Sequence, residues 1–384
     1  MQILTFVGFY LPGYKAGGPI RTLSNMVDRL GNELQFQIVT ADRDFGDKKP
    51  YPGIKIDAWN RVGKANVCYM SPNRRSLMDF KRLLCSTEYD ILYLNSFFSP
   101  HFTIKALLLR RLRLIADKPL IIAPRGEFSP GAFGLKGLKK RVYITVAKAL
   151  GLYKEAVWQA SSEQEDANIR RWFGSDVRVI IAPNLSPVIN AADGSVAVKD
   201  KTRGCFKTIF LSRISRTKNL YGALKMLKGL KGKVEFNIYG PMEDKTYWTE
   251  CQKIVRSLPE NIDVKYCGSV AHDKVGIVMR EHDLFFLPTL GENFGHVILE
   301  ALCAGCPVLI SDQTPWRGLE EKGVGWDLSL SKPEMFREVL QRCVDMNDEE
   351  YMKWSERARE YGVNVSRDDN VVKQNRQLFY KAVV

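Results

Sequence analysis

Short apolar runs alternate with helical patterns from one end of the chain to the other. In the amino-terminal half, the runs of strand length are ILTFVGF (3–9), FQIVTA (36–41), ILYLN (91–95), LIIAP (120–124), AVWQA (156–160) and VRVIIAP (177–183). Helical patterns lie between them, at 18–31, 75–87, 100–115, 135–150 and 162–173. Strands that alternate with helices in this way predict βα units and parallel sheets.

The same alternation starts again after a polar stretch at 184–204. Strands are expected at 208–212, 234–240, 264–268, 284–288 and 307–311. Helices are expected at 219–230, 245–257, 272–281, 294–304 and 315–322, with three more after residue 332. The break predicts a first domain of residues 1–190, a linker at 191–204, a second domain at 205–365 and a terminal helix at 366–384.

Length and composition agree with two soluble α/β domains. The chain has 384 residues, of which 45% are hydrophobic and 26% charged, as in globular proteins. Its first residues, MQILTFVGFY, resemble a β-strand more than a signal peptide, and no apolar run reaches the length of a membrane span. Eight scattered cysteines suit a reducing compartment.

Positive charge is concentrated in one segment. The formal net charge is +14, and residues 100–154 hold 12 basic and 2 acidic residues. Basic residues there alternate with leucine, valine and isoleucine, notably at Arg110, Arg111, Arg113, Lys136, Lys139, Lys140 and Arg141. The pattern favours an amphipathic surface that binds anionic lipid headgroups. Two alternatives are an ordinary solvated helix face and a nucleic-acid-binding surface.

Candidate chemistry lies after the predicted strands, because ligands of open α/β sheets bind at the carboxyl ends of the strands. In TLGENFGHVILEALCAGCPVLISD, Glu292 follows a strand and Glu300 lies eight residues later. Asn293, Phe294 and Gly295 are expected to open a helix whose amino end attracts phosphate. Glu300 is expected further along this helix, about 12 Å from Glu292. The alternative is a capping glutamate followed by a salt-bridge partner.

Four other stretches fall at strand ends. Arg213 and Lys218, in LSRISRTKNL, could clamp a diphosphate, or they could be solvated loop cations. Gly17 and Gly18 follow the first strand and form a close-approach loop. APRGEF places Arg125 and Glu127 after the fourth strand. The Asp42-Arg43-Asp44 sequence is expected to be a solvated loop, and no metal site is predicted.

These residues resemble the family 4 retaining glycosyltransferases. The likeness is carried by the E-x7-E pair of GENFGHVILEALCAGCPVL, the R-x4-KN of LSRISRTKN, the YGP at 239–241 and the GGP at 17–19. It implies a GT-B fold, in which two Rossmann-like domains face each other across a cleft and the last helix crosses back to the first domain. It also implies a nucleotide-sugar donor of UDP or GDP type, no metal, and retention at the anomeric carbon.

The resemblance also implies a role for each matching residue. Glu292 would bind hydroxyls of the donor sugar, and the amides of Phe294 and Gly295 would contact the sugar or a phosphate. Glu300 would bind the ribose, and Arg213 and Lys218 would neutralise the departing diphosphate. Gly17, Gly18 and Gly240 would let the backbone approach the donor.

One departure from the family concerns the first domain. Many members carry a histidine after its fourth strand, whereas here that place is taken by Arg125. Either Arg125 or Glu127 would then position the reacting groups, or that role is absent. Glu163 and Glu165 in SSEQED are further candidates, with a helix cap at Ser161 or Ser162 as the alternative.

The sequence therefore predicts a cytoplasmic, retaining, metal-independent hexosyltransferase at the inner face of the plasma membrane. Its acceptor would be a glycan linked to polyprenyl diphosphate, in capsule or O-antigen assembly. One alternative is another GT-B enzyme, either a nucleotide-sugar epimerase or a sugar phosphorylase. The other is a basic, non-enzymatic nucleic-acid-binding protein, which leaves Glu292 and Glu300 without a role.

Overall fold

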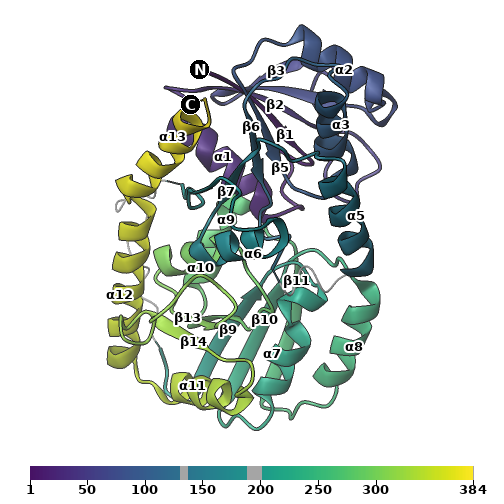
Figure 1. The fold of residues 1–384 in the computed structure, drawn as a ribbon. Coiled ribbons are helices and arrows are strands. Elements are labelled where there is room, and N and C mark those ends of the chain that lie inside the picture. The colour runs from purple at the N-terminus through teal and green to yellow at the C-terminus, as the bar shows by residue number, and fades with distance from the viewer. Residues whose placement is uncertain (130–136, 188–200, 384) are drawn as a thin grey trace. The chain divides into compact units, whose positions relative to one another are not determined.

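A computed structural model describes residues 1–129, 137–187 and 201–383. The chain divides into two compact units (Figure 1): unit 1 is Met1–Pro187 with Asp368–Val384, and unit 2 is Val188–Arg367. Each unit contains one sheet. Residues 191–200 of the expected linker, and Lys136 of the basic segment, lie outside the described residues.

The sheet of unit 1 has eight strands in the order β3-β4-β2-β1-β5-β6-β7-β8. Neighbouring strands are parallel except for β3 and β4, which are antiparallel. The strands are β1 (Gln2–Val7), β2 (Gln35–Ala41), β3 (Trp59–Val62), β4 (Ala65–Met70), β5 (Ile91–Asn95), β6 (Leu120–Ala123), β7 (Val157–Ala160) and β8 (Val179–Ile181). The chain reverses direction across the sheet between β1 and β5, which makes this pair the topological switch point.

Helices cover both faces of this sheet. They are α1 (Gly18–Leu30), α2 (Leu77–Ser86), α3 (Lys105–Arg111), α5 (Gly137–Ala149), α6 (Glu163–Phe173) and α13 (Asp369–Val383), with short helical turns at η1 (Pro72–Arg74) and η2 (Pro100–Ile104). Local signals set their starts. Ser76 and Asp79 form a capping box at α2. Ser162, one of the two serines named in the alternative for SSEQED, caps α6.

Period-two alternation in the central strand divides the core of unit 1 in two. On β1, Leu4 and Phe6 join one hydrophobic cluster, and Ile3 and Val7 join the other. Successive side chains of a strand point to opposite faces, so a strand that is covered on both faces must be apolar throughout. This is why the run ILTFVGF lacks alternating polar residues.

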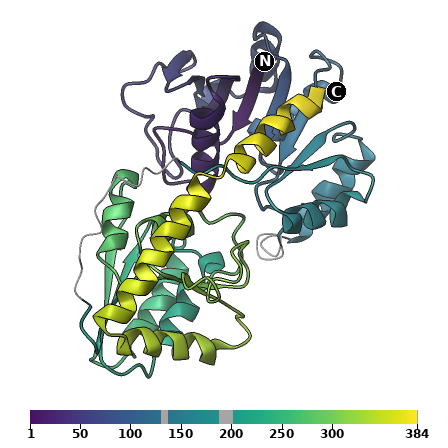
Figure 2. The ribbon, with the colours of Figure 1, turned by 90° about the vertical axis from the view of Figure 1, so that its left-hand side faces the viewer.

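The terminal helix α13 packs on the sheet of unit 1 (Figure 2). The Phe379 ring meets the rings of Phe36 and Tyr93 at centroid distances of 5.9 and 5.4 Å. Asn375 donates to the carbonyl of Pro183 at 2.7 Å. The last helix of the chain therefore completes the core of the first unit.

Unit 2 has six parallel strands in the order β11-β10-β9-β12-β13-β14. The strands are β9 (Cys205–Leu211), β10 (Lys233–Tyr239), β11 (Ile262–Gly268), β12 (Leu284–Leu287), β13 (Val308–Ser311) and β14 (Gly325–Leu328). The helices are α7 (Leu220–Leu227), α8 (Lys245–Val255), α9 (His272–Arg280), α10 (His296–Cys303), α11 (Pro333–Asp345) and α12 (Asp348–Ser366), with a helical turn η3 (Arg216–Lys218). The switch point lies between β9 and β12.

The structure differs from the predicted elements in two ways. Three strands were not predicted, because β3 is a half-exposed edge strand, β4 contains an exposed asparagine and β14 is an edge strand that contains a glycine and an aspartate. The helix predicted at 315–322 is wrong, since that segment forms turns. Pro315 and Gly318, which has a φ of 63°, interrupt the helical pattern there.

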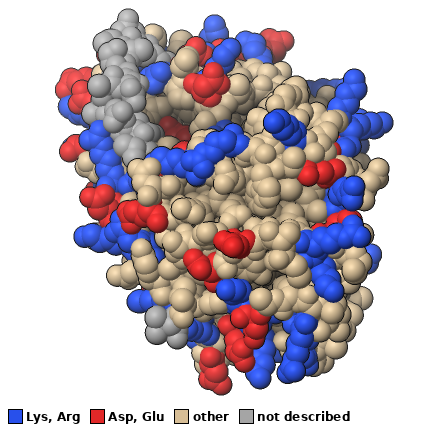
Figure 3. Space-filling view, turned by 90° about the horizontal axis from the view of Figure 1, so that it is seen from above, with Lys and Arg blue, Asp and Glu red and all other residues tan. Residues whose placement is uncertain are grey.

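The surface mixes the two signs of charge. On the face drawn in Figure 3, lysine and arginine side chains alternate with acidic side chains and with uncharged surface. Within the described residues, no helix is both long enough and apolar enough to cross a bilayer.

Candidate active site

Two loops meet at the switch point of unit 2, one after β9 and one after β12. The N–H of Leu290 and the hydroxyl of Thr289 both donate to the carbonyl of Thr217, at 2.7 and 3.0 Å. Asn219 donates from its side chain to the carbonyl of Pro288 at 2.9 Å. These bonds hold the two loops together, and the loops carry the candidate residues Arg213, Lys218 and Glu292.

Lys218 and Glu292 form an ion pair across these loops. The Lys218 ammonium donates to Oε1 of Glu292, and the two side chains are only 11% and 14% exposed. Among the described residues, no group donates to the other carboxylate oxygen, Oε2. The pair thus places a fixed positive charge and a fixed hydrogen-bond acceptor side by side at the carboxyl edge of the sheet.

Arg213 is paired with a residue that sequence reasoning missed. Its Nη1 lies 2.9 Å from Oε2 of Glu243, which follows β10 in the YGPMED stretch. Both side chains are about one-third exposed, and an exposed pair of this kind contributes about 1 kcal/mol or less. Arg213 can therefore leave Glu243 for a stronger anion at little cost.

Gly240 lies where two strand ends make close contact. A Cβ atom at this position would be 1.9 Å from the carbonyl oxygen of Ser212, and the φ angle is 135°. The N–H of Ser212 donates to the carbonyl of Tyr239 at 3.0 Å, so the backbone has no room to move away. Glycine is required here by the approach of β10 to the end of β9.

The helix that follows Glu292 begins later than predicted. α10 starts at His296, and Gly295 precedes it with a left-handed φ of 75°. Glu292 therefore lies outside the helix, and the expected helical spacing of Glu292 and Glu300 is wrong. Glu300 is on α10 and meets Nδ1 of His272 on α9 at 3.6 Å.

The amino end of α10 is nevertheless open to an anion. Within the described chain, no side chain caps this helix and its first turn has no acidic residue. The carbonyl of Phe294 accepts from the indole N–H of Trp316 at 2.6 Å, which fixes the turn. The first-turn amides and the positive end of the helix dipole then lie next to the loop that carries Glu292.

In unit 1, the loop with Gly17 and Gly18 is held by Asp44. Oδ2 of Asp44 accepts from the N–H groups of Tyr14 and Lys15, at 2.8 and 3.0 Å. Gly17 has a φ of 75° and precedes α1, and a Cβ atom at Gly18 would meet nothing within 4 Å. Packing within the protein does not require glycine at position 18, so the space beside it is available to a ligand.

The expectation that Asp42 and Asp44 are solvated is wrong. They are 1% and 4% exposed. Each Asp42 oxygen accepts from the Arg43 guanidinium at 2.9 Å, and Asp44 holds the loop described above. Burial is possible because hydrogen bonds and an opposite charge replace the lost water. Within the described residues, no group of three or more His, Cys, Asp or Glu could hold a metal ion.

Arg125 lies at the carboxyl edge of unit 1, after β6. Nε and Nη2 donate to Oδ1 of Asn95, at 3.1 and 2.7 Å, and Nη1 donates to Oδ1 of Asn184 at 2.8 Å. Nη2 also contacts the hydroxyl of Tyr93. Its hydrogen-bond acceptors in the described chain are thus uncharged, and its positive charge remains for a ligand. The buried Nδ2 of Asn95 has no hydrogen-bond acceptor in this part of the structure.

Glu127 and Glu165 hold the turn around Arg125. Glu127 accepts from the N–H groups of Phe97 and Phe98, at 2.6 and 3.1 Å, and from the hydroxyl of Ser96. Burial raises the pKa of Glu127, and the hydrogen bonds oppose this shift. Glu165 accepts from the N–H of Gly126 at 2.5 Å and from Ser161. Both carboxylates are fully occupied by the protein, which leaves Arg125 as the available group.

Sequence reasoning missed the residues that hold the candidates in place. Asn95 and Asn184 each come directly after an apolar run, ILYL and VIIAP, so a strand-end asparagine was an available signal. Glu243 follows YGP and could have been found in the same way. Thr289 and Trp316 donate from their side chains to the backbone carbonyls of Thr217 and Phe294. No sequence pattern reveals hydrogen bonds of this kind.

Residues 197–361 match the family described as "Glycosyl transferases group 1". The chain therefore contains a glycosyltransferase domain. The match falls entirely within unit 2 and includes the loops with Arg213, Lys218 and Glu292. It argues against both alternatives considered from the sequence, another kind of GT-B enzyme and a non-enzymatic binding protein.

Solved structures with the GT-B fold resemble this glycosyltransferase over its full length. Sucrose-phosphate synthase from Thermosynechococcus elongatus is 15% identical, with a TM-score of 0.73 and coverage of 99% of this chain and 98% of that one. HepE from Anabaena, in complex with UDP and glucose, is 18% identical, with a TM-score of 0.67 and coverage of 99% of both chains. WaaG, a glycosyltransferase of lipopolysaccharide biosynthesis, is 14% identical, with a TM-score of 0.67 and coverage of 98% of both.

These comparisons confirm the predicted fold class, with two α/β domains built on parallel sheets. Among curated proteins, no sequence matches the glycosyltransferase significantly.

Proposed function

We propose that the protein is a retaining glycosyltransferase that transfers a sugar from a UDP- or GDP-sugar, without a metal ion, to a lipid-linked glycan. Unit 2 would bind the donor, and unit 1 would bind the acceptor. The observation that carries the proposal is the Lys218–Glu292 pair at the switch point of unit 2, beside the open amino end of α10.

The geometry of this site matches a sugar joined to a diphosphate. Oε2 of Glu292 is available to accept from a sugar hydroxyl. Lys218 and the amides of Phe294 and Gly295 offer positive charge to the phosphates. Arg213, released from its exposed pair with Glu243, would add a second cation to stabilise the leaving diphosphate. Glu300, further along α10, would accept from the ribose, and Gly240 would let the nucleotide approach the end of β10.

On the acceptor side, Arg125 would position the attacking hydroxyl. Its guanidinium is fixed by Asn95 and Asn184 at the carboxyl edge of the sheet of unit 1. Gly17 and Gly18 would let a ligand approach the backbone of the loop after β1. The HepE complex contains UDP and glucose, which supports a nucleotide-sugar donor for a chain of the same fold.

The test is nucleotide release from UDP-, GDP-, ADP- and CMP-sugars in the presence of EDTA. Slow release from one donor is expected without an acceptor, and it identifies the base and the sugar together. The configuration of the transferred sugar, measured by NMR, then tests retention. Release that requires an added divalent cation would contradict the metal-independent mechanism, and inversion of the anomeric centre would contradict retention.

Membrane binding is proposed for one face of α5. Leu138, Val142 and Val146 of α5, and Leu150 directly after it, recur every four residues, and each is about half or more exposed. Lys139, Arg141 and Lys148 flank this apolar stripe. Exposed apolar rows beside basic residues are typical of helices that lie on anionic lipid, so the proposal places the enzyme at the inner face of the plasma membrane. Capsule or O-antigen assembly is the pathway we propose for such an acceptor.

Arg110, which the sequence placed in the membrane-binding strip, has a structural role. Its side chain is 14% exposed, pairs with Asp117 at 2.7 Å and donates to the carbonyl of Lys154 at 3.1 Å. Substitution of Arg110 would therefore disturb folding, and tests of membrane binding must use exposed residues of α5.

Replacing both Val142 and Val146 by aspartate is expected to lower binding to phosphatidylglycerol vesicles at least about tenfold, because two apolar contacts are lost and two negative charges are added. The measurement is sedimentation with vesicles. Ile277→Asp is the matched control, since Ile277 is an equally exposed apolar residue on α9 in unit 2. Equal losses in both variants, or no loss in the first, would contradict the membrane proposal.

A further inference from the structure

Three basic side chains converge at the carboxyl edge of unit 1. Arg75 lies between η1 and α2, His101 is in the first turn of η2, and Lys105 begins α3. We call these residues the Arg75 cluster. The loops that carry them follow β4 and β5, so the cluster lies at the edge where ligands of open α/β sheets bind.

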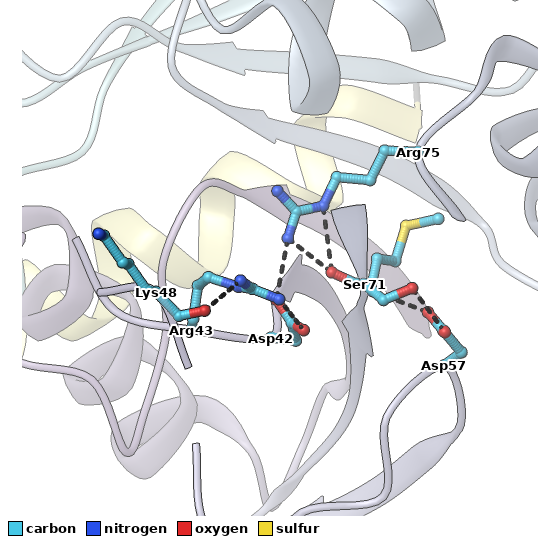
Figure 4. A network of polar contacts seen from close by, with 7 residues as sticks. Asp42, Arg43, Lys48, Asp57, Ser71 and Arg75 are labelled. Atoms are coloured by element: carbon cyan, nitrogen blue, oxygen red, sulfur yellow. Dashed lines mark hydrogen bonds and ion pairs between the residues drawn. The ribbon is translucent and has the colours of Figure 1, made fainter. Parts of the chain in front are cut away.

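Arg75 is held from one side only (Figure 4). Nε and Nη2 donate to the carbonyl of Met70 at 3.1 and 2.6 Å, and Nη2 lies 3.3 Å from Oδ1 of Asp42. Among the described residues, no acceptor meets Nη1. Asp42 is already engaged by Arg43 through both of its oxygens. The buried Asp42 carboxylate therefore pairs with both Arg43 and Arg75. Within the described residues, Nη1 of Arg75 has no acceptor.

Lys105 and His101 are in direct contact. The Lys105 ammonium lies 3.0 Å from Nδ1 of His101 and also donates to the carbonyl of Arg75. An ammonium group can only donate, so Nδ1 of His101 must accept, and the ring proton is on Nε2. Nε2–H remains as a donor that points away from Lys105.

Arg75 and Lys105 each lie over an aromatic ring, and the two rings are in contact. The Arg75 guanidinium lies 5.6 Å from the centroid of the Phe102 ring, and the Lys105 ammonium lies 5.7 Å from that of Phe80. The two rings meet edge to face, with centroids 5.9 Å apart. The apolar rings cannot neutralise the charges, but they hold the two cationic groups next to each other.

The negative charge in direct contact with the cluster is Asp42, which pairs with Arg75 and is shared with Arg43. In the described chain, no acidic group forms an ion pair with Lys105 or His101. Burial lowers the pKa of Lys105, and the charge of Arg75 lowers it further, with only partial compensation from Asp79. Burial also lowers the pKa of His101, as do Lys105 and Arg75. Asp79 is itself committed to the cap of α2 and lies near Arg74 and Arg82. An anion bound here would relieve repulsion that the protein leaves uncompensated.

We propose that the Arg75 cluster binds a phosphate group of the acceptor. Nη1 of Arg75, the ammonium of Lys105 and Nε2–H of His101 supply three donor groups, which match the three terminal oxygens and the near −2 charge of a phosphate better than the two oxygens of a carboxylate. This inference rests on the proposed function, in which the donor occupies unit 2 and the acceptor unit 1. The phosphate could belong to a soluble sugar phosphate or to a lipid diphosphate.

The test is binding of inorganic pyrophosphate to the full-length protein, measured by calorimetry with saturating UDP to fill the donor site. The dissociation constant is expected to rise about tenfold or more in Lys105→Met, because a charge-assisted hydrogen bond is lost. His101→Ala, at an exposed position, should show a similar loss without affecting folding. Lys118→Met is the control, since it removes the same charge just before β6, at the opposite edge of the sheet.

The inference is overturned if the wild-type protein does not bind pyrophosphate, or if Lys105→Met and Lys118→Met bind it equally well. Competition by glucose 6-phosphate or by farnesyl diphosphate in detergent then identifies a sugar phosphate or a lipid diphosphate as the source. Hydrolysis of the donor by the wild-type protein is measured in parallel. If the wild-type protein does not hydrolyse the donor, the proposed function is contradicted. Pyrophosphate binding tests the phosphate site and does not depend on that hydrolysis.

Discussion

Lys218→Met is expected to lower turnover of the nucleotide sugar about 100- to 1000-fold, the usual effect of losing one group that stabilises transition-state charge. The ammonium is fixed by Glu292 and needs no reorganisation when the diphosphate departs. The loss should appear in kcat more than in KM, because the charge on the leaving group develops during the reaction. The measurement is steady-state kinetics with the donor identified by nucleotide release.

A stability effect must be separated from this catalytic one. Removing Lys218 leaves Glu292 unpaired at a site where both side chains are largely buried, and breaking such a pair costs about 3 kcal/mol. The double variant Lys218→Met/Glu292→Gln has no unpaired charge, so it is expected to regain most of the thermal stability and none of the activity. Recovery of activity together with stability would show that the pair only supports the fold.

Gly240→Ala is expected to destabilise unit 2 by about 3 kcal/mol, which combines overlap with a backbone atom and strain at a positive φ. The added Cβ atom would lie 1.9 Å from the carbonyl oxygen of Ser212, and that backbone is tied to β10. For a unit of this size, the unfolding temperature should fall by about 6–12 °C. Differential scanning calorimetry measures the shift.

Gly268→Ala is the matched control for this substitution. Gly268 ends the neighbouring strand, its carbonyl accepts from the N–H of Gly240, and its φ is 76°. A Cβ atom there would meet nothing within 4 Å. This variant should therefore show only the strain of a positive φ, about 1 kcal/mol. Equal shifts in the two variants would mean that the strand ends separate easily, and that Gly240 is not required by packing.

Much of the fold could be predicted from the sequence because the apolar runs are long and regular. Strands such as ILTFVGF are buried on both faces, so their residues are apolar apart from the buried Thr5. The elements that were missed, β3, β4 and β14, are edge strands or strands with polar residues. The sheet gives them hydrogen-bond partners, and their own sequences carry little signal.

For the candidate site, the sequence determined which residue types follow the strands. Arg213, Lys218, Glu292 and Arg125 could be named because the carboxyl end of a parallel strand is where ligands bind. The open amino end of α10 could also be expected, although the sequence placed the start of the helix too early.

Only the tertiary structure decided which of these groups meet. Lys218 and Glu292 are 74 residues apart and form one pair, whereas Glu292 and Glu300 face different partners despite lying in one motif. Asp42 and Asp44 look like a solvated loop in the sequence and are buried in the fold. The physical reason is that a charge is stabilised by what surrounds it in space. Those surroundings come from distant loops, which local spacing in a sequence does not encode.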